Sequence, residues 1–123
     1  MAKPRILLID DEEIVLTGWR EDLKPVDCDI RVALDGEKAL EMLREDKADI
    51  VITDLVMPYI SGVGVISIIK KKYPGIPVIA ITGWGEHPGA LANEAEADLV
   101  LDKPFELPDL DNRVTEMLSR KEE

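Results

Sequence analysis

Apolar residues along the chain gather in five short runs that alternate with longer amphipathic stretches. Four of the runs are apolar almost throughout, which is typical of parallel strands covered on both faces. The second run, Asp29–Ala33, mixes polar and apolar residues and therefore suits an edge-like position. The expected strands are 5–10, Asp29–Ala33, Ile50–Asp54, Val78–Thr82 and Leu99–Asp102.

The stretches between the strands carry apolar residues at helical spacing. Helices are expected at 12–23, 35–46, 61–73 and 107–120, with Asp35 and Ser61 as candidate N-caps of the second and third. Pro108 is tolerated in the first turn of the last helix, where its missing N–H would be unpaired in any case. The residues expected to face inward are Ile14, Val15, Trp19 and Leu23; Ala39, Leu40 and Leu43; Val65, Ile66, Ile68 and Ile69; and Leu110, Val114, Met117 and Leu118.

Strands that alternate with helices predict an α/β fold, a parallel sheet with helices on both faces. The chain has 123 residues and shows no repeat or linker, so we expect one domain over 1–123. No apolar run is long enough to span a membrane, and the first residues do not resemble a signal peptide. The lone Cys28 cannot form an internal disulfide, which suits the cytoplasm.

The net charge of −11 argues against direct nucleic-acid binding, because neutralising phosphates needs clustered Lys and Arg. The position of a few carboxylates is more informative than their number. Parallel α/β sheets bind ligands beyond the carboxyl ends of their strands. Polar side chains follow four of the five expected strands there, namely Asp10 with Asp11, Asp54, Thr82 and Lys103.

Three carboxylates within a few ångströms repel one another, so they need a cation or raised pKa values. A set of oxygen ligands completed by water suits Mg²⁺ better than a soft metal. A carboxylate is also a known nucleophile in phosphoryl transfer, which relies mainly on positioning and charge neutralisation. The residues therefore favour Mg²⁺-dependent phosphoryl chemistry at this edge.

The combined set of motifs resembles the receiver domain of bacterial two-component response regulators over nearly the whole chain. The motifs are Asp10-Asp11, the run from Asp54 through Met57-Pro58 to Gly62, Thr82-Gly83, and Lys103-Pro104-Phe105. The resemblance implies a flavodoxin-like fold with strand order 2-1-3-4-5, and a sensor histidine kinase or phosphotransfer protein as phosphoryl donor. It implies that Asp54 accepts the phosphoryl group, and that Asp11, Asp54 and the carbonyl of Val56 bind Mg²⁺ directly, with Asp10 acting largely through water. Lys103 and Thr82 would contact phosphoryl oxygens, and the Lys103–Pro104 bond would be cis.

Each motif also has an ordinary structural interpretation. The acidic residues at 10–12 could cap a helix, and Asp54 could simply end a strand. Thr82 could be half-buried in a strand, and Lys103 could be a solvated surface charge. Four such features at four strand ends make a coincidence improbable. Trp19 is interpreted as a core residue, and His87 as an exposed loop residue.

Three features depart from the receiver pattern. Val100 stands where the family usually has Tyr or Phe, so an aromatic rotamer switch cannot operate there. Gly and Pro residues after Thr82 predict a short fourth helix around 90–96. Val56 and Trp84 are apolar and cannot orient water, which predicts slow self-dephosphorylation.

Two competing functions remain open. A Mg²⁺-dependent phosphohydrolase would generally carry its nucleophile after the first strand, in an Asp-x-Asp pattern. A receiver-like scaffold that binds partners without phosphorylation would not need the acidic pair, Asp54, Thr82 and Lys103. The downstream target is not predicted, and weak dimerisation remains possible.

Overall fold

The computed structural model describes residues 3–54, 62–82, 98–102 and 107–122. The described strands form one parallel five-stranded sheet in the order β2-β1-β3-β4-β5. The strands are β1 (Arg5–Ile9), β2 (Asp29–Ala33), β3 (Ile50–Asp54), β4 (Val78–Thr82) and β5 (Leu99–Asp102). The α/β fold and strand order are confirmed, and the mixed strand β2 lies at an edge of the sheet, as its composition predicts.

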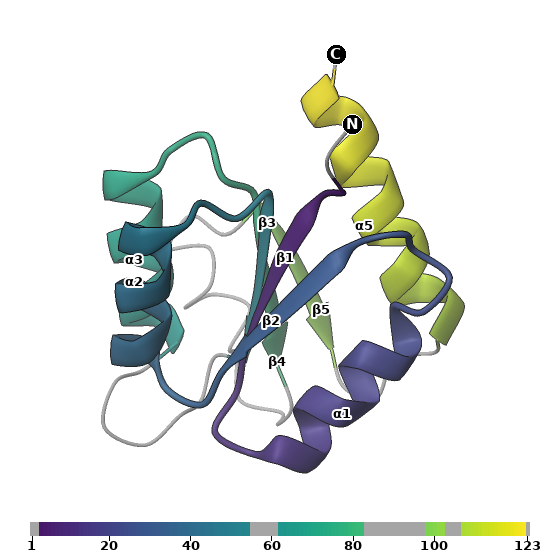
Figure 1. Ribbon diagram of the computed structural model, residues 1–123, viewed down its shortest axis with the longest axis horizontal. Coiled ribbons are helices and arrows are strands. Elements are labelled where there is room, and N and C mark those ends of the chain that lie inside the picture. The colour runs from purple at the N-terminus through teal and green to yellow at the C-terminus, as the bar shows by residue number, and fades with distance from the viewer. Residues whose placement is uncertain (1–2, 55–61, 83–97, 103–106, 123) are drawn as a thin grey trace.

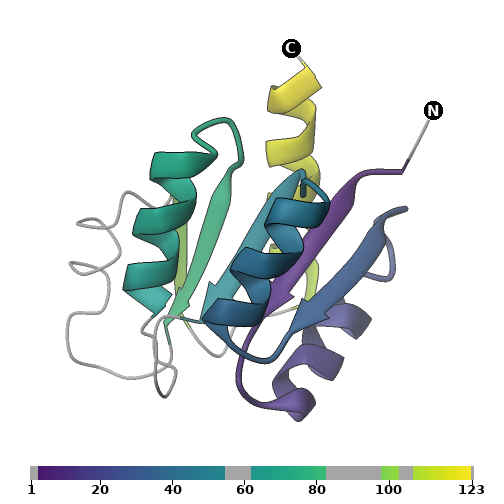
Figure 2. The same cartoon turned by 60° about the vertical axis from the view of Figure 1, so that its left-hand side comes forward.

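The helices cover both faces of this sheet (Figure 1). They are α1 (Glu13–Asp22), α2 (Gly36–Glu45), α3 (Gly62–Lys72) and α5 (Leu107–Glu122). Helices α2 and α3 contact each other on one face, and α1 and α5 contact each other on the other, an arrangement also visible in Figure 2. The described part of the chain therefore has three layers, with the sheet in the middle.

Alternation along β1 divides the core in two. Leu7 and Ile9 pack with the residues of α2 and α3, whereas Ile6 and Leu8 pack with those of α1 and α5. All four side chains are buried, because successive residues of a strand point to opposite faces and both faces are covered. This explains the uninterrupted apolar run in the sequence.

Asp35 caps α2 as predicted, because its carboxylate accepts a hydrogen bond from the backbone N–H of Lys38 at 2.7 Å. The predicted inward residues of α2 and α5 are all buried or packed against a core cluster. Trp19 is likewise buried in the core between α1, α5 and the sheet.

Two residues predicted to face inward are exposed. Ile14 has 79% of its surface exposed, and Leu16 takes the core position in α1 together with Trp19 and Leu23. At about 100° per residue, Ile14 lies on roughly the opposite side of the helix from Leu16. Ile68 of α3 is also exposed, because Val65, Ile66 and Ile69 already fill the buried face and Ile68 lies beside it.

None of the helices within the described ranges is both long enough and apolar enough to cross a lipid bilayer. The candidate cap Ser61, the expected fourth helix at 90–96, His87 and the Lys103–Pro104 bond lie outside the described residues.

Candidate functional site

The strand register brings two of the predicted acidic positions to neighbouring places on the sheet. Strand β1 pairs with β3 through Ile9 and Thr53, so the next residues along the two strands are Asp10 and Asp54. The chain runs from β1 outward to β2 on one side, and through β3 to β4 and β5 on the other. The carboxyl ends of β1 and β3 therefore flank the point where strand order switches, where α/β sheets bind ligands.

Three carboxylates meet at this point. One oxygen from each of Asp10, Asp11 and Asp54 lies within 4.8 Å of the other two. Asp10 is 1% exposed and Asp54 is 9% exposed, whereas Asp11 lies open to solvent. Asp10 and Asp54 therefore form the buried side of the cluster, and Asp11 forms its solvent-facing side.

Asp10 also shapes the chain that leads into α1. Its Oδ1 accepts a hydrogen bond from the backbone N–H of Glu12 at 2.9 Å, and its own N–H donates to the carbonyl of Ala33 at 3.2 Å. Glu12 is the N-cap of α1, but its side chain makes no capping hydrogen bond. Asp10 therefore holds the turn that leads into α1 and does not cap the helix itself, and this turn was not predicted from the sequence.

Asp54 ends a fully buried strand. Its neighbour Thr53 donates its hydroxyl proton to the carbonyl oxygen of Asp54 at 3.0 Å, and Asp54 itself pairs in the sheet with Ile81 of β4. Backbone pairing with β1 and β4 on both sides gives this carboxylate a rigid support. A rigid support is what a nucleophile needs if its geometry is to be held from one reaction to the next.

The donor set fits a small divalent cation. Carboxylate oxygens are the preferred ligands of Mg²⁺, which usually takes only a few of them and keeps several waters. Its ligand oxygens lie about 3–4 Å apart, which is compatible with carboxylate oxygens that all lie within 4.8 Å of one another. The exposed side chain of Asp11 leaves one side of the cluster open to the water that Mg²⁺ usually keeps.

The remaining predicted site residues follow the neighbouring strands. Thr82 ends β4 and pairs with Asp102, the last residue of β5, which Lys103 follows in sequence. The register thus places the backbone of Thr82 at the same edge of the sheet as Asp54. Val56 and Lys103 lie outside the described residues, and so do Gly83, Trp84 and Phe105.

Cys28 shows the features of a packed thiol. It is half-buried against the α1 and α5 side of the core. Burial raises the pKa of the Cys28 thiol, and the neighbouring carboxylates of Asp27 and Asp29 act in the same direction. The thiol therefore stays protonated at neutral pH and is a poor nucleophile.

Comparison with known proteins gives a consistent result. The family model described as the response regulator receiver domain matches residues 6–115. Among curated proteins, the transcriptional regulatory protein PrrA of Mycobacterium tuberculosis is 31% identical over 98% of this chain and 52% of its own length. The chain spans about half the length of the curated relatives that head this comparison.

Solved structures share the fold closely. A response regulator receiver domain protein from Clostridium thermocellum is 32% identical with a TM-score of 0.87, covering 97% of each chain. A structure described as the BeF3-activated DrrB receiver domain is 29% identical with a TM-score of 0.86, covering 98% of this chain and 100% of that one. The fold, the acidic cluster at the switch point and the family match agree: the chain belongs to the response regulator receiver domain family, whose function is phosphorylation-based signalling in two-component systems.

Proposed function

We propose that Asp54 is the phospho-acceptor of this receiver domain and that the domain itself catalyses both the gain and the loss of the phosphoryl group. The observation that carries the proposal is the convergence of Asp10, Asp11 and Asp54 at the switch point, with Asp54 held between two strands. Residues 1–123 would act as one receiver unit.

In the proposed reaction, a carboxylate oxygen of Asp54 attacks the phosphorus of a phosphohistidine on a sensor kinase or phosphotransfer protein. The new O–P bond forms as the P–N bond breaks, and the imidazole nitrogen keeps the electron pair of the broken bond. The product is an acyl phosphate on Asp54. Hydrolysis reverses the change when water attacks the phosphorus and the carboxylate leaves.

Asp54 and Asp11 would hold Mg²⁺ together with the carbonyl of Val56, and Asp10 would act largely through water. The bound cation would offset the repulsion between the phosphoryl group and the attacking carboxylate. Asp10 has a second task, because its hydrogen bond to the N–H of Glu12 fixes the turn that carries Asp11.

The Lys103 ammonium would bind one phosphoryl oxygen and Thr82 would donate a hydrogen bond to another. Contacts of this kind neutralise charge that builds up in the transition state. Movement of Thr82 toward the phosphoryl group would alter the partner-binding surface, and Val100 leaves no aromatic ring to move with it. We place the reaction in the cytoplasm, with no direct nucleic-acid or membrane contact by this chain.

Beryllofluoride, which mimics an acyl phosphate, and acetyl phosphate together test the proposal. The protein is incubated with each reagent in the presence and absence of Mg²⁺, and adducts are counted by mass spectrometry under native conditions. We expect one adduct that requires Mg²⁺ and that Asp54→Ala abolishes. Asp29→Ala is the matched control, because Asp29 is an exposed aspartate at the far end of strand β2.

The competing functions give different results in the same experiment. A scaffold that binds partners without phosphorylation gives no adduct in either condition. A phosphohydrolase turns over a foreign phosphoester such as p-nitrophenyl phosphate. An adduct that persists in Asp54→Ala would assign the acceptor to another residue and overturn the proposal.

A further inference from the structure

A charged pair lies at the opposite end of the sheet from the carboxylate cluster. The ammonium of Lys70, near the end of α3, lies 2.8 Å from Oδ2 of Asp98, the residue immediately before β5. Lys70 also donates to the carbonyl of Ile76 at 3.3 Å. Its side chain is only 15% exposed, whereas that of Asp98 is 36% exposed, so the ammonium is the better shielded of the two groups.

Asp98 also forms two hydrogen bonds with Val78, the first residue of β4. Its backbone N–H donates to the carbonyl of Val78 at 2.9 Å, and its carboxylate accepts from the N–H of Val78 at 2.7 Å. The same Oδ2 therefore joins a backbone donor to a lysine ammonium. Charge-assisted hydrogen bonds of this kind are stronger than those between neutral groups.

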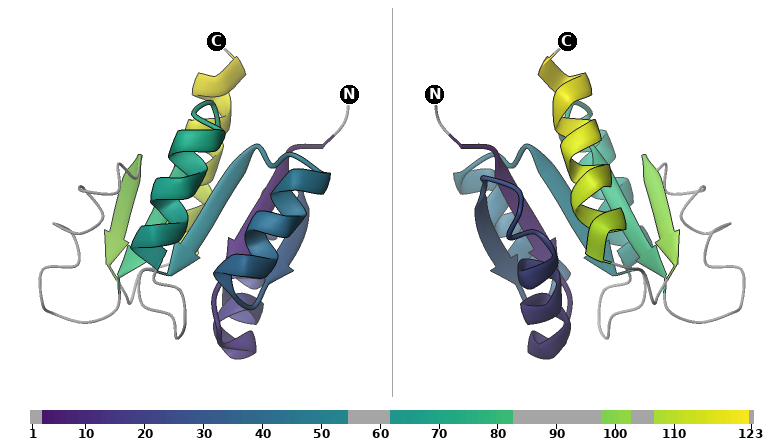
Figure 3. Two further views of the ribbon diagram at one scale, coloured as in Figure 1. Left: turned by 90° about the vertical axis from the view of Figure 1, so that its left-hand side faces the viewer. Right: turned by 90° about the vertical axis from the view of Figure 1, so that its right-hand side faces the viewer.

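The contacts that Lys70 and Asp98 make with each other, with Ile76 and with Val78 are called the clamp from here on, and they act at the start of an edge strand. Strand β5 has four residues, lies at the outer edge of the sheet and pairs, among the described strands, with β4 alone (Figure 3). A slip of one residue would turn every side chain of a strand to the other face. The clamp fixes which residue of β5 starts opposite Ile79, and so which residue ends opposite Thr82.

We propose that Lys70 and Asp98 are positioning residues for the phosphoryl transfer, acting through the register of β5 on Lys103. The inference rests on the proposed function, because it assumes that Lys103 contacts the phosphoryl group. The register places Asp102 beside Thr82, and Lys103 is the next residue. A clamp at residue 98 thus controls where the chain delivers an ammonium group to the site.

Loss of the clamp should affect the rate of phosphoryl transfer but not the affinity for Mg²⁺, whereas a general loss of stability would change both. The three carboxylates are carried by β1, β3 and the turn after β1, none of which the clamp touches. Mg²⁺ affinity should therefore survive loss of the clamp, whereas phosphoryl transfer should suffer. A misplacement of a catalytic group by about 1 Å costs up to about a hundredfold in rate.

The test compares Lys70→Met with Lys71→Met, a change of the same charge at an exposed lysine one residue further along α3. Mg²⁺ dissociation constants and rates of Asp54 phosphorylation by acetyl phosphate are measured at a temperature where circular dichroism shows each variant folded. We expect Lys70→Met to slow phosphorylation by about tenfold, with an unchanged Mg²⁺ dissociation constant. Lys71→Met should match the unaltered protein, and Lys70→Arg should recover most of the rate.

A double-mutant cycle with Lys103→Ala then tests the route of the effect. If the clamp acts through Lys103, Lys70→Met should cause no further slowing in the Lys103→Ala background. Asp98→Asn provides a second variant, since its side-chain carbonyl keeps an acceptor for the N–H of Val78 while the charge is lost. An unaltered rate in both clamp variants, or equal slowing with and without Lys103, overturns the proposal. Failure of the unaltered protein to take up phosphate would instead reject the proposed function.

Discussion

Asp22 is a carboxylate placed where its charge is unfavourable. It is the last residue of α1, near the negative end of the helix dipole. Partial burial raises the pKa of Asp22, and the carboxylates of Asp111 on α5 and of Glu21 raise it further. The folded protein therefore holds a proton on Asp22 more tightly than the unfolded chain does.

The raised pKa of Asp22 makes the stability of the folded protein depend on pH. The stability contributed by Asp22 falls as pH rises from its ordinary pKa of 3.8 through the raised value of the folded state. At neutral pH the loss is complete, so Asp22→Asn should raise the free energy of unfolding by about 0.5 kcal/mol. Urea unfolding at pH 7 and at pH 4 checks this, and the gain should be smaller at pH 4, which lies close to the ordinary pKa of 3.8.

Asp29→Asn removes the same charge from an exposed position and serves as the control. If it stabilises the protein as much as Asp22→Asn does, relief of the overall charge of −11 explains the effect, and the local interpretation is wrong.

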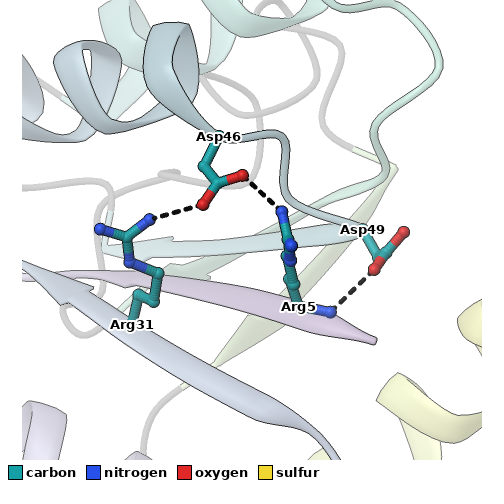
Figure 4. A network of polar contacts seen from close by, with 4 residues as sticks. All are labelled: Arg5, Arg31, Asp46 and Asp49. Carbon is teal, nitrogen blue, oxygen red and sulfur yellow. Dashed lines mark hydrogen bonds and ion pairs between the residues drawn. The ribbon is translucent and has the colours of Figure 1, made fainter. Parts of the chain in front are cut away.

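Among the elements, the C-terminal end of α2 is joined to two strands through one carboxylate (Figure 4). Asp46, the C-cap of α2, lies 2.5 Å from the guanidinium of Arg5 on β1 and 3.4 Å from that of Arg31 on β2. The same end of β1 is tied to the residue just before β3, because the N–H of Arg5 donates to Asp49 at 2.7 Å. The network links three strands and a helix at the end of the sheet opposite the candidate site.

Removal of Asp46 should loosen this end of the sheet. The three side chains are half-exposed, so solvent screening limits the value of each pair, and Asp46→Ala should cost about 1 kcal/mol. Urea unfolding should show a lower midpoint with an unchanged slope. Glu45→Ala, an exposed carboxylate one residue earlier, should change the midpoint little, and an equal loss there would rule out a specific network.

The strands could be predicted from the sequence, because a strand that is buried on both faces has apolar residues at nearly every position. Helix faces were harder: Ile14 and Leu16 are both apolar, and only packing against α5 and the sheet selects Leu16. The three carboxylates could be predicted as neighbours, because parallel strands place their carboxyl ends together. The contact between Lys70 and Asp98 could not be predicted from the sequence. The two residues are 28 positions apart, and nothing in the sequence around either one indicates the other as its partner.

At the scale of the whole molecule, the fold concentrates negative charge in a protein that is already acidic. The net charge is −11, and the sheet topology brings Asp10, Asp11 and Asp54 within a few ångströms of one another. Mutual repulsion among these carboxylates opposes folding when no cation is bound. The site is thus expected to reduce stability in exchange for function, a common feature of active sites.

A cation that binds the folded state but not the unfolded chain should reverse this loss. At a free Mg²⁺ concentration ten times the dissociation constant, linkage predicts a gain of about 1.4 kcal/mol. For a domain of this size, that corresponds to a rise of about 5 °C in Tm. Thermal unfolding is followed by circular dichroism in MgCl₂ and in NaCl of equal ionic strength, since NaCl reproduces only the general screening of charge.

Asp11→Asn distinguishes binding from screening, because it removes one of the three charges from the solvent-facing side of the cluster. This variant should be more stable than the unaltered protein without Mg²⁺, and it should gain little when Mg²⁺ is added. Asp29→Asn, with the same change in net charge, should keep the full Mg²⁺ response. Equal increases in Tm from NaCl and MgCl₂ would show that the carboxylate cluster does not hold the cation. An Asp11→Asn protein that is less stable than the unaltered protein without Mg²⁺ would show that repulsion within the cluster does not oppose folding.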